Sequence, residues 1–265
     1  MGYFGSTIPV TGLNLGYLGQ VSRTGVREIA SRQANASNKN AISFGDPVQI
    51  VSDATGGTYR QIADGIANFS LLFNPFTNFA GIAVREVKTN LASYPYVPGV
   101  LQTGNYQAGE MAEVLERGSI CVKINVGTGI GQGLPVYLRV LANAGVSAGV
   151  VGGFEAQADV AITTTATASA ASTAVTLVSG SGVAIGQYVS GPKGIAPGTY
   201  VAGISGTALT LSQATTEAVA AGTPISITWT VPLVSLSGRP ILAFRTGVLD
   251  ANNVAEVTLL DRVSA

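Results

Sequence analysis

The chain of 265 residues contains no histidine and only one cysteine, Cys121. Without histidine the protein lacks the side chain that most often serves as a general base near neutral pH and as a metal ligand. A single cysteine can form neither an internal disulfide nor a thiolate cluster for zinc. The many serine and threonine hydroxyls have no convincing basic partner that would activate them. We therefore predict that the protein is not an enzyme, with no catalytic residues, no cofactor and no metal.

Charged residues are also scarce. Fourteen Lys and Arg balance fourteen Asp and Glu, and together they make up 11% of the chain, against about 25% in an average soluble protein. A zero net charge lacks the surplus of cations that nucleic acids require, and the apolar run at 140–154 is interrupted by polar residues and glycines. We predict neither a nucleic-acid nor a membrane partner. Such a surface either stays soluble through its Thr and Ser hydroxyls or is covered by other protein, and we favour the second interpretation.

Residues 1–80 show little sustained periodicity. Glycine, asparagine, serine and threonine dominate, and aromatic and aliphatic residues are spaced out between them. This composition is typical either of a disordered tail or of an extended arm with short strands at most. The aromatic content favours an N-terminal arm that lies across a neighbouring molecule.

Period-two alternation is clear over 81–159 and again over 230–265. Ile120, Val122 and Ile124 share one face of a predicted strand. Val136 and Leu138 share one face of the following predicted strand. We predict that these two strands form a hairpin. Together the two segments are expected to form a compact β-barrel or β-sandwich domain.

Residues 160–229 differ sharply from their surroundings. They are almost entirely Thr, Ala, Ser, Val and Gly, with Lys193 and Glu217 as the only charges. Short strand-like runs alternate with turn signals such as Ser205-Gly206. The predicted fold class is therefore mainly β, with an extended N-terminal arm and with 160–229 as an inserted, surface-projecting small all-β domain.

Two glycine-rich stretches were tested as phosphate-binding loops. In 127–133 the glycines fall at every second position and a strand pattern follows, so no helix N-terminus is available for a phosphate. In the stretch from Gly186, Pro192 separates the glycine from Lys193. Neither stretch predicts nucleotide binding. The turn at 250–253 is acidic and amide-rich, but it lacks the glycine and the terminal Glu of a calcium loop and is better explained as a hairpin turn.

Several segments resemble the structural cement, or capsid decoration, proteins of tailed bacteriophages. The resemblance lies in FAGIAVREVKT (79–89), YQAGEMAEVLERGSICVKINVGTG (106–129), GLPVYLRV (133–140), GGFEAQAD (152–159) and GRPILAFRTGVLDANNVAEVTLL (238–260). Residues 160–229 depart from that compact pattern and resemble a small β module that recurs in phage virion proteins.

The resemblance implies a structural virion protein on the outer surface of the capsid, made in the cytoplasm of the bacterial host. It would cement neighbouring subunits of the major capsid protein and stabilise the expanded head. Closed symmetry is the usual form of homo-oligomers, so we expect a homo-oligomer, as a trimer or else a dimer. The residues that we expect to contact a partner lie in the arm: Tyr3, Phe4, Arg23, Arg27, Arg32 and Phe44.

An alternative function remains open from the sequence. Residues 160–229 could bind a glycan or a host surface, because aromatic rings stack on sugars and this segment offers three of them. The candidates are Tyr188, Tyr200 and Trp229. Ordinary packing within a β domain also explains these residues and is the interpretation that we favour.

Overall fold

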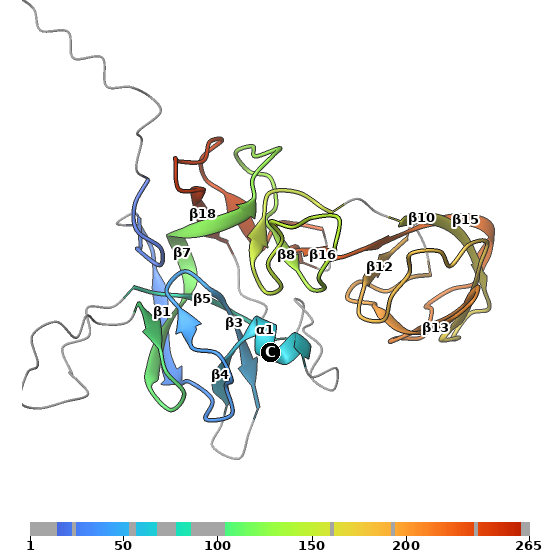
Figure 1. Ribbon diagram of the computed structural model, residues 1–265, viewed down its shortest axis with the longest axis horizontal. Coiled ribbons are helices and arrows are strands. Elements are labelled where there is room, and N and C mark those ends of the chain that lie inside the picture. Colours follow the sequence, from blue (N-terminus) through green and yellow to red (C-terminus); the bar gives the residue numbers. More distant parts are fainter. Residues whose placement is uncertain are drawn as a thin grey trace, which may run out of the picture.

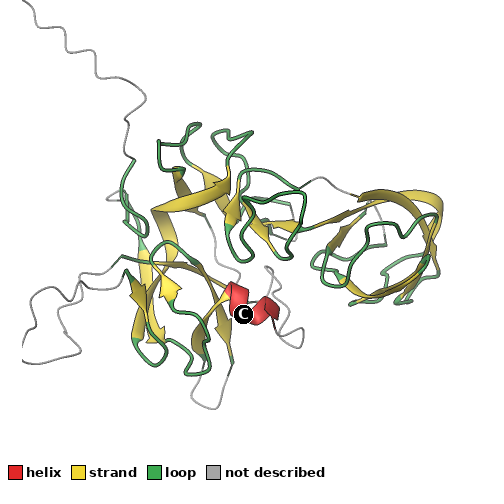
Figure 2. Cartoon of the chain, viewed as in Figure 1, coloured by secondary structure: helices red, strands yellow, loops and turns green. Residues whose placement is uncertain are grey.

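The computed structural model describes most of the chain, and its fold is mainly β (Figures 1 and 2). Within the described residues there is one helix, the short α1 (Ile62–Ala67). The mainly β fold class predicted from the sequence is therefore confirmed. The described residues are 15–22, 25–52, 57–67, 78–85, 104–159, 162–191, 194–235 and 238–260.

Strand β7 (Met111–Val126) is 16 residues long and connects two parts of a ten-stranded sheet. Its first half pairs with β1 and β5, and its second half pairs with β18 and β9. The partners change at Gly118, whose φ of +128° is rarely adopted by a residue with a side chain. The four partner strands are β1 (Glu28–Gln33), β5 (Phe79–Ala83), β9 (Phe154–Glu155) and β18 (Val254–Leu259).

The first half of β7 belongs to a small barrel, which we call the first barrel. Its strand order is β4-β3-β5-β7, with β1 on β7, and a bridge between Ala34 and Tyr59 joins the end of β1 back to β4. The added strands are β3 (Pro47–Val51) and β4 (Thr58–Gln61), and a separate pair is formed by β2 (Ile42–Ser43) and β6 (Asn105–Tyr106). The core is made of Ala34, Ile42, Val48, Tyr59, Ala80, Ala83, Tyr106, Ala112 and Val114.

The second half of β7 belongs to a second barrel. Here β7 pairs with β18, β18 with β17, and β8 with β9, which returns to β7. The ring is completed where Phe244 N–H donates to the Leu134 carbonyl (3.0 Å) and Val136 N–H to the Leu242 carbonyl (3.0 Å). Its further strands are β8 (Tyr137–Arg139), β16 (Thr230–Pro232), which pairs with β8, and β17 (Leu242–Phe244). The largest hydrophobic cluster of the described residues fills this barrel and continues to Ile62, Phe79, Ile82 and Leu115 beside it.

A separate six-stranded sheet, the third barrel, lies to one side of the other two (Figure 1). A bridge between Tyr188 and Tyr200 joins the two end strands, and Val189 N–H donates to the Thr199 carbonyl (2.9 Å). Because this closure pairs the strand edges, it removes a template for unwanted sheet extension. The strands are β10 (Ile162–Ala168), β11 (Ala174–Leu177), β12 (Tyr188–Ser190), β13 (Val201–Ser205), β14 (Ala208–Leu211) and β15 (Val219–Thr228).

For residues 1–80 the sequence predicted an extended arm with short strands at most. The structure instead has strands of the main sheet in this segment. Strands β1, β3 and β4 are all part of the ten-stranded sheet, and residues such as Ile42 and Val48 are fully buried. The alternation was hidden because much of the first barrel's core is built from alanine and tyrosine instead of a run of branched aliphatics. The arm before residue 15 lies outside the described residues, and the division into three domains stays a prediction.

The predicted hairpin between the strands around 120–126 and 136–140 is wrong. Strand β9 lies between β7 and β8, parallel to the first and antiparallel to the second. The intervening glycine-rich loop leads to Leu134 and Val136, which bind β17. Periodicity identified the strands but could not reveal a third strand, distant in sequence, inserted between them. The hairpin predicted around Asp250 is confirmed, because β17 and β18 pair antiparallel across that turn.

We predict that Gly81→Ala strongly destabilises the protein. A Cβ on Gly81 would lie 2.1 Å from the Leu115 carbonyl oxygen of β7, and the φ of Gly81 is +146°. Because backbone cannot move away as a flexible side chain can, β5 would separate from β7, with a loss of several kcal/mol, about 3 or more, measured by chemical denaturation. The control is Gly133→Ala, with a φ of +81° and no atom within 4 Å of the new Cβ, for which about 1 kcal/mol is expected. Equal losses would contradict the close approach.

Candidate functional site

Residues 15–22, which we call the strap, lie along the second half of β7. Gly19 N–H donates to the Cys121 carbonyl (2.9 Å), Cys121 N–H to the Gln20 carbonyl (3.0 Å), and Val21 forms a bridge with Ile120. On its other side the Gly19 carbonyl accepts from Arg85 N–H (2.7 Å). The strap is therefore held between β7 and the end of β5, where the N-terminal part of the chain meets the two barrels.

Two buried carboxylates also hold the strap. Ser22 Oγ donates to Glu256 Oε1 (2.7 Å). Leu15 N–H donates to Asp250 Oδ2 (3.3 Å), and the other oxygen of Asp250 accepts from Val254 N–H (2.8 Å) within its own turn. These contacts connect residues more than 230 positions apart, so the start of the described chain is fixed to its last strand.

The strap covers the single cysteine. Cys121 is fully buried, and its Sγ donates to the Leu15 carbonyl (3.3 Å). Burial, with the nearby carboxylates of Glu256 and Asp250, raises the pKa of the Cys121 thiol to about 11. Since the thiolate is the reactive form, a buried thiol with a raised pKa should react slowly near neutral pH.

A buried ionic network lies in the second barrel. Arg139 of β8 donates through Nε and Nη2 to Glu155, with Nη2–Oε2 at 3.0 Å, and through Nη1 to Asp159 Oδ2 (2.8 Å). Burial lowers the pKa of Arg139, but the hydrogen bonds and charges of both carboxylates outweigh this effect and leave that pKa raised. Burial raises the pKa of Glu155, against the hydrogen bonds from Arg139. The bidentate geometry compensates for taking these charges out of water.

This network adjoins the connection to the third barrel. Asp159 N–H donates to Thr230 Oγ1 (3.0 Å), which joins the chain before β10 to the chain after β15. The Trp229 carbonyl accepts from Val140 N–H (2.9 Å), next to Arg139. Sequence reasoning missed this network. The only feature of the sequence that pointed to it was the pair of acids Glu155 and Asp159 in a short stretch without other charges.

The six residues predicted to contact a partner are not all brought together. Tyr3, Phe4 and Arg23 lie outside the described residues. Arg27 is exposed just before β1 and Arg32 is half-buried within β1. Phe44 is half-buried, and its ring packs edge-on against Tyr106 with the centroids 5.3 Å apart. Of the described three, Arg27 has the most open position.

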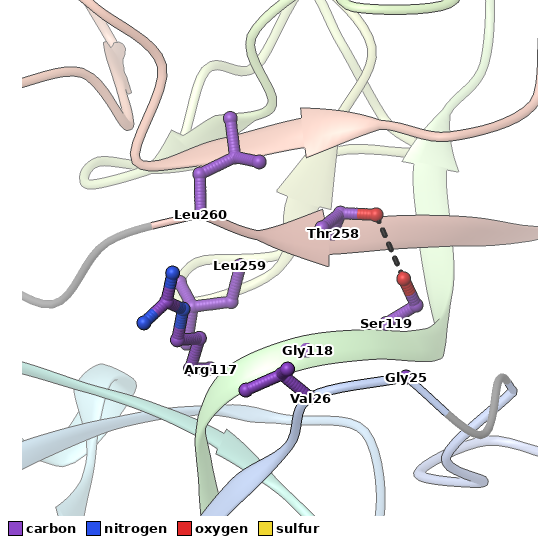
Figure 3. Close-up of a pocket in the computed structure, with 8 residues that line it drawn as sticks. All are labelled: Gly25, Val26, Arg117, Gly118, Ser119, Thr258, Leu259 and Leu260. Atoms are coloured by element: carbon purple, nitrogen blue, oxygen red, sulfur yellow. Dashed lines mark hydrogen bonds between the residues drawn. The ribbon is translucent and has the colours of Figure 1, made fainter.

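Next to Arg27 the surface forms a hollow of about 170 Å³ where β7 changes partners (Figure 3). Val26 on one side is 80% exposed, Leu260 on the other is 48% exposed, and the exposed Arg117 of β7 lies between them. The floor is fixed by Ser119 and Thr258, whose hydroxyls hydrogen-bond at 2.8 Å. The hollow is lined by Gly25, Val26, Arg117, Gly118, Ser119, Thr258, Leu259 and Leu260.

The three aromatic residues considered for glycan stacking are all half-buried. Tyr188 and Tyr200 bridge the end strands of the third barrel. Tyr188 also packs against the core of the second barrel, and its burial raises the pKa of its hydroxyl. These contacts give each tyrosine a structural role, and the glycan-binding alternative stays a prediction.

Other chemistry was sought in the same described ranges. No group of three or more His, Cys, Asp or Glu side chains there is placed to hold a metal ion. No helix in that part of the chain combines the length and the apolar character needed to cross a bilayer. As predicted, a strand and not a helix follows the glycine-rich stretch after residue 126.

The structure thus defines a multi-barrel β protein with an anchored N-terminal strap and an exposed hollow that combines apolar and cationic side chains. A family model described as structural cement protein (E217 gp24/Pam3 gp6) matches residues 4–228. The chain belongs to this family of phage cement proteins, which makes it a structural protein of the phage virion. The matched range includes the third barrel, which the sequence had set apart from the family pattern. No curated protein matches the chain.

We predict that Cys121 reports the position of the strap. In the native protein at pH 8, a disulfide reagent should modify Cys121 at least tenfold more slowly than in denaturant, because the thiol is buried and its pKa is about 11. Removal of residues 1–20 should abolish most of this protection. Rapid modification of the intact native chain would contradict the covering role of the strap.

We also predict that Arg139→Met costs about 3–5 kcal/mol of unfolding free energy, because it leaves two carboxylates buried without their partner. The triple change Arg139→Met, Glu155→Gln and Asp159→Asn should cost less than the single change, since it removes the uncompensated charges as well. Chemical denaturation measures both. The matched control is Arg245→Met, at an exposed arginine, with an expected loss below about 0.5 kcal/mol. A triple variant less stable than the single one would contradict this account.

Proposed function

We propose that the protein binds the outer surface of an expanded phage head and holds neighbouring subunits of the major capsid protein together. Membership in the cement family is the observation that carries this proposal. A protein that binds only the expanded lattice stabilises that state by mass action. Contacts repeated by the symmetry of the shell add through effective concentration, so each contact can be weak.

Two features of the structure support this role. The end strands of the third barrel are joined by the bridge between Tyr188 and Tyr200, and those of the first by the bridge between Ala34 and Tyr59, so these two barrels offer little open edge for uncontrolled sheet extension. The strap anchors the chain at Leu15 on the turn of Asp250. An arm formed by residues 1–14 would therefore start from a fixed point and could reach a neighbouring subunit.

The expected oligomeric state is also related to the arm. Copies related by closed symmetry would place several arms around one lattice position. A homo-oligomer, as a trimer or else a dimer, remains our expectation, and the third barrel is expected to project from the capsid.

The arm can be tested without damage to the fold. Removal of residues 1–44 would delete β1 and the buried Ala34 and Ile42, so the informative truncation ends at residue 14. We predict that the full chain binds expanded heads, fails to bind unexpanded ones, and raises the temperature at which the heads break open. The truncated chain should keep its fold and show reduced occupancy, measured by cosedimentation and gel densitometry.

Different outcomes test the two parts of the proposal, which are the binding to expanded heads and the role of the arm. Equal binding of the full chain to expanded and unexpanded heads, or no binding, would overturn the cement mechanism. Undiminished occupancy by the truncated chain would remove only the arm from it.

A further inference from the structure

The zero net charge of the chain conceals an uneven distribution of charge between interior and surface. Among the described residues seven of the ten Lys and Arg are exposed, but only two of the eleven Asp and Glu. The exposed cations are Arg27, Lys39, Arg85, Arg117, Lys123, Arg239 and Arg245. The exposed acids are Glu28 and Glu217.

Few of the described acids are exposed, because the fold uses several of them as internal hydrogen-bond acceptors. Asp64 accepts from the N–H groups of Lys39 (2.8 Å) and Asn40 (3.1 Å). Asp250 and Glu256 hold the strap, and two further acids neutralise Arg139. The described surface is therefore cationic although the sequence is neutral, and such a surface favours an acidic partner.

The cations lie on the first two barrels. In the described part of the third barrel the only charged residue is Glu217. An acidic partner surface would therefore attract the first two barrels and leave the third one outside the contact.

The hollow in Figure 3 brings exposed cationic and apolar side chains together. Arg117 lines it, and Arg27 lies against it, since a Cβ built on Gly118 would be 3.4 Å from Arg27 Cβ. Glu28 is the register partner of Arg117 on β1, yet the guanidinium of neither Arg27 nor Arg117 makes an ion pair or a hydrogen bond with any described residue. The exposed Arg117 lies between Val26 and Leu260, and Arg27 is next to the hollow, so cationic and apolar side chains adjoin at one site, as they do at many interaction sites.

We propose that this hollow is the docking point for an acidic segment of the major capsid protein, which packs an apolar side chain against Val26 and Leu260. Its carboxylates would pair with Arg27 and Arg117, in the bidentate geometry that arginine allows. The inference rests on the proposed cement function and locates it on the body of the protein, apart from the arm. It adds Arg117 and Leu260 to the contact residues that the sequence suggested.

The test uses the full chain and expanded heads assembled from the cognate major capsid protein. The variants are Arg27→Glu with Arg117→Glu, and Val26→Asn with Leu260→Asn. Each pair should weaken binding about tenfold or more in cosedimentation. The variant Arg27→Lys with Arg117→Lys keeps the charge and should retain most of the affinity. Because these side chains are exposed, all the variants should stay folded, and a cooperative thermal transition checks this. The Glu variant is expected to lose a little stability, since Glu28 lies opposite Arg117.

Matched controls decide whether the effect is local. Arg245→Glu changes an exposed cation elsewhere on the body, and Val178→Asn changes a valine of the third barrel that is 77% exposed. Both should bind within about twofold of the unaltered chain. If the unaltered chain binds and neither hollow variant loses affinity, this inference is wrong, and the proposed cement function is unaffected. An equal loss of binding in Arg245→Glu would overturn it as well, because it would indicate that the capsid attracts all exposed cations of the protein alike. An unaltered chain that fails to bind would overturn both.

Discussion

The pairing of one long strand, β7, with different partners along its length is the constraint on which the body of the protein depends. Its first half closes the first barrel with β1 and β5, and its second half closes the second barrel with β18 and β9. The two barrels thus share a continuous backbone, and a change in one alters the position of the other. The change of partners at Gly118 also creates the hollow that we assign to the capsid contact.

The buried acids serve the same architecture. Asp250 and Glu256 attach the strap to the last hairpin, and Glu155 and Asp159 hold Arg139 beside the connection to the third barrel. Each carboxylate that is used inside the fold leaves one less negative charge on the surface. A chain with equal numbers of acids and bases can in this way present a cationic face to its partner.

Much of the local structure could be predicted from the sequence. The strands near 120–126 and 136–140, and the all-β character of 160–229, were found because alternation is a property of adjacent residues. The strands of the first barrel were largely missed, because much of their core is formed by alanine and tyrosine among polar residues. The predicted contact residue Arg27 lies at the hollow, but Arg117 was unremarkable in sequence because only the bend of β7 brings it there.

The sequence by itself determined the mainly β class and the distinct character of 160–229, since composition and short-range alternation carry that information. The kinship with phage cement proteins is also a property of the sequence, through the resemblance of whole segments to that family. Only the tertiary structure decided which strands are neighbours, as the insertion of β9 between β7 and β8 shows. It also decided which charges reach solvent. Both depend on contacts between residues far apart in the chain, for which a single sequence contains no local signal.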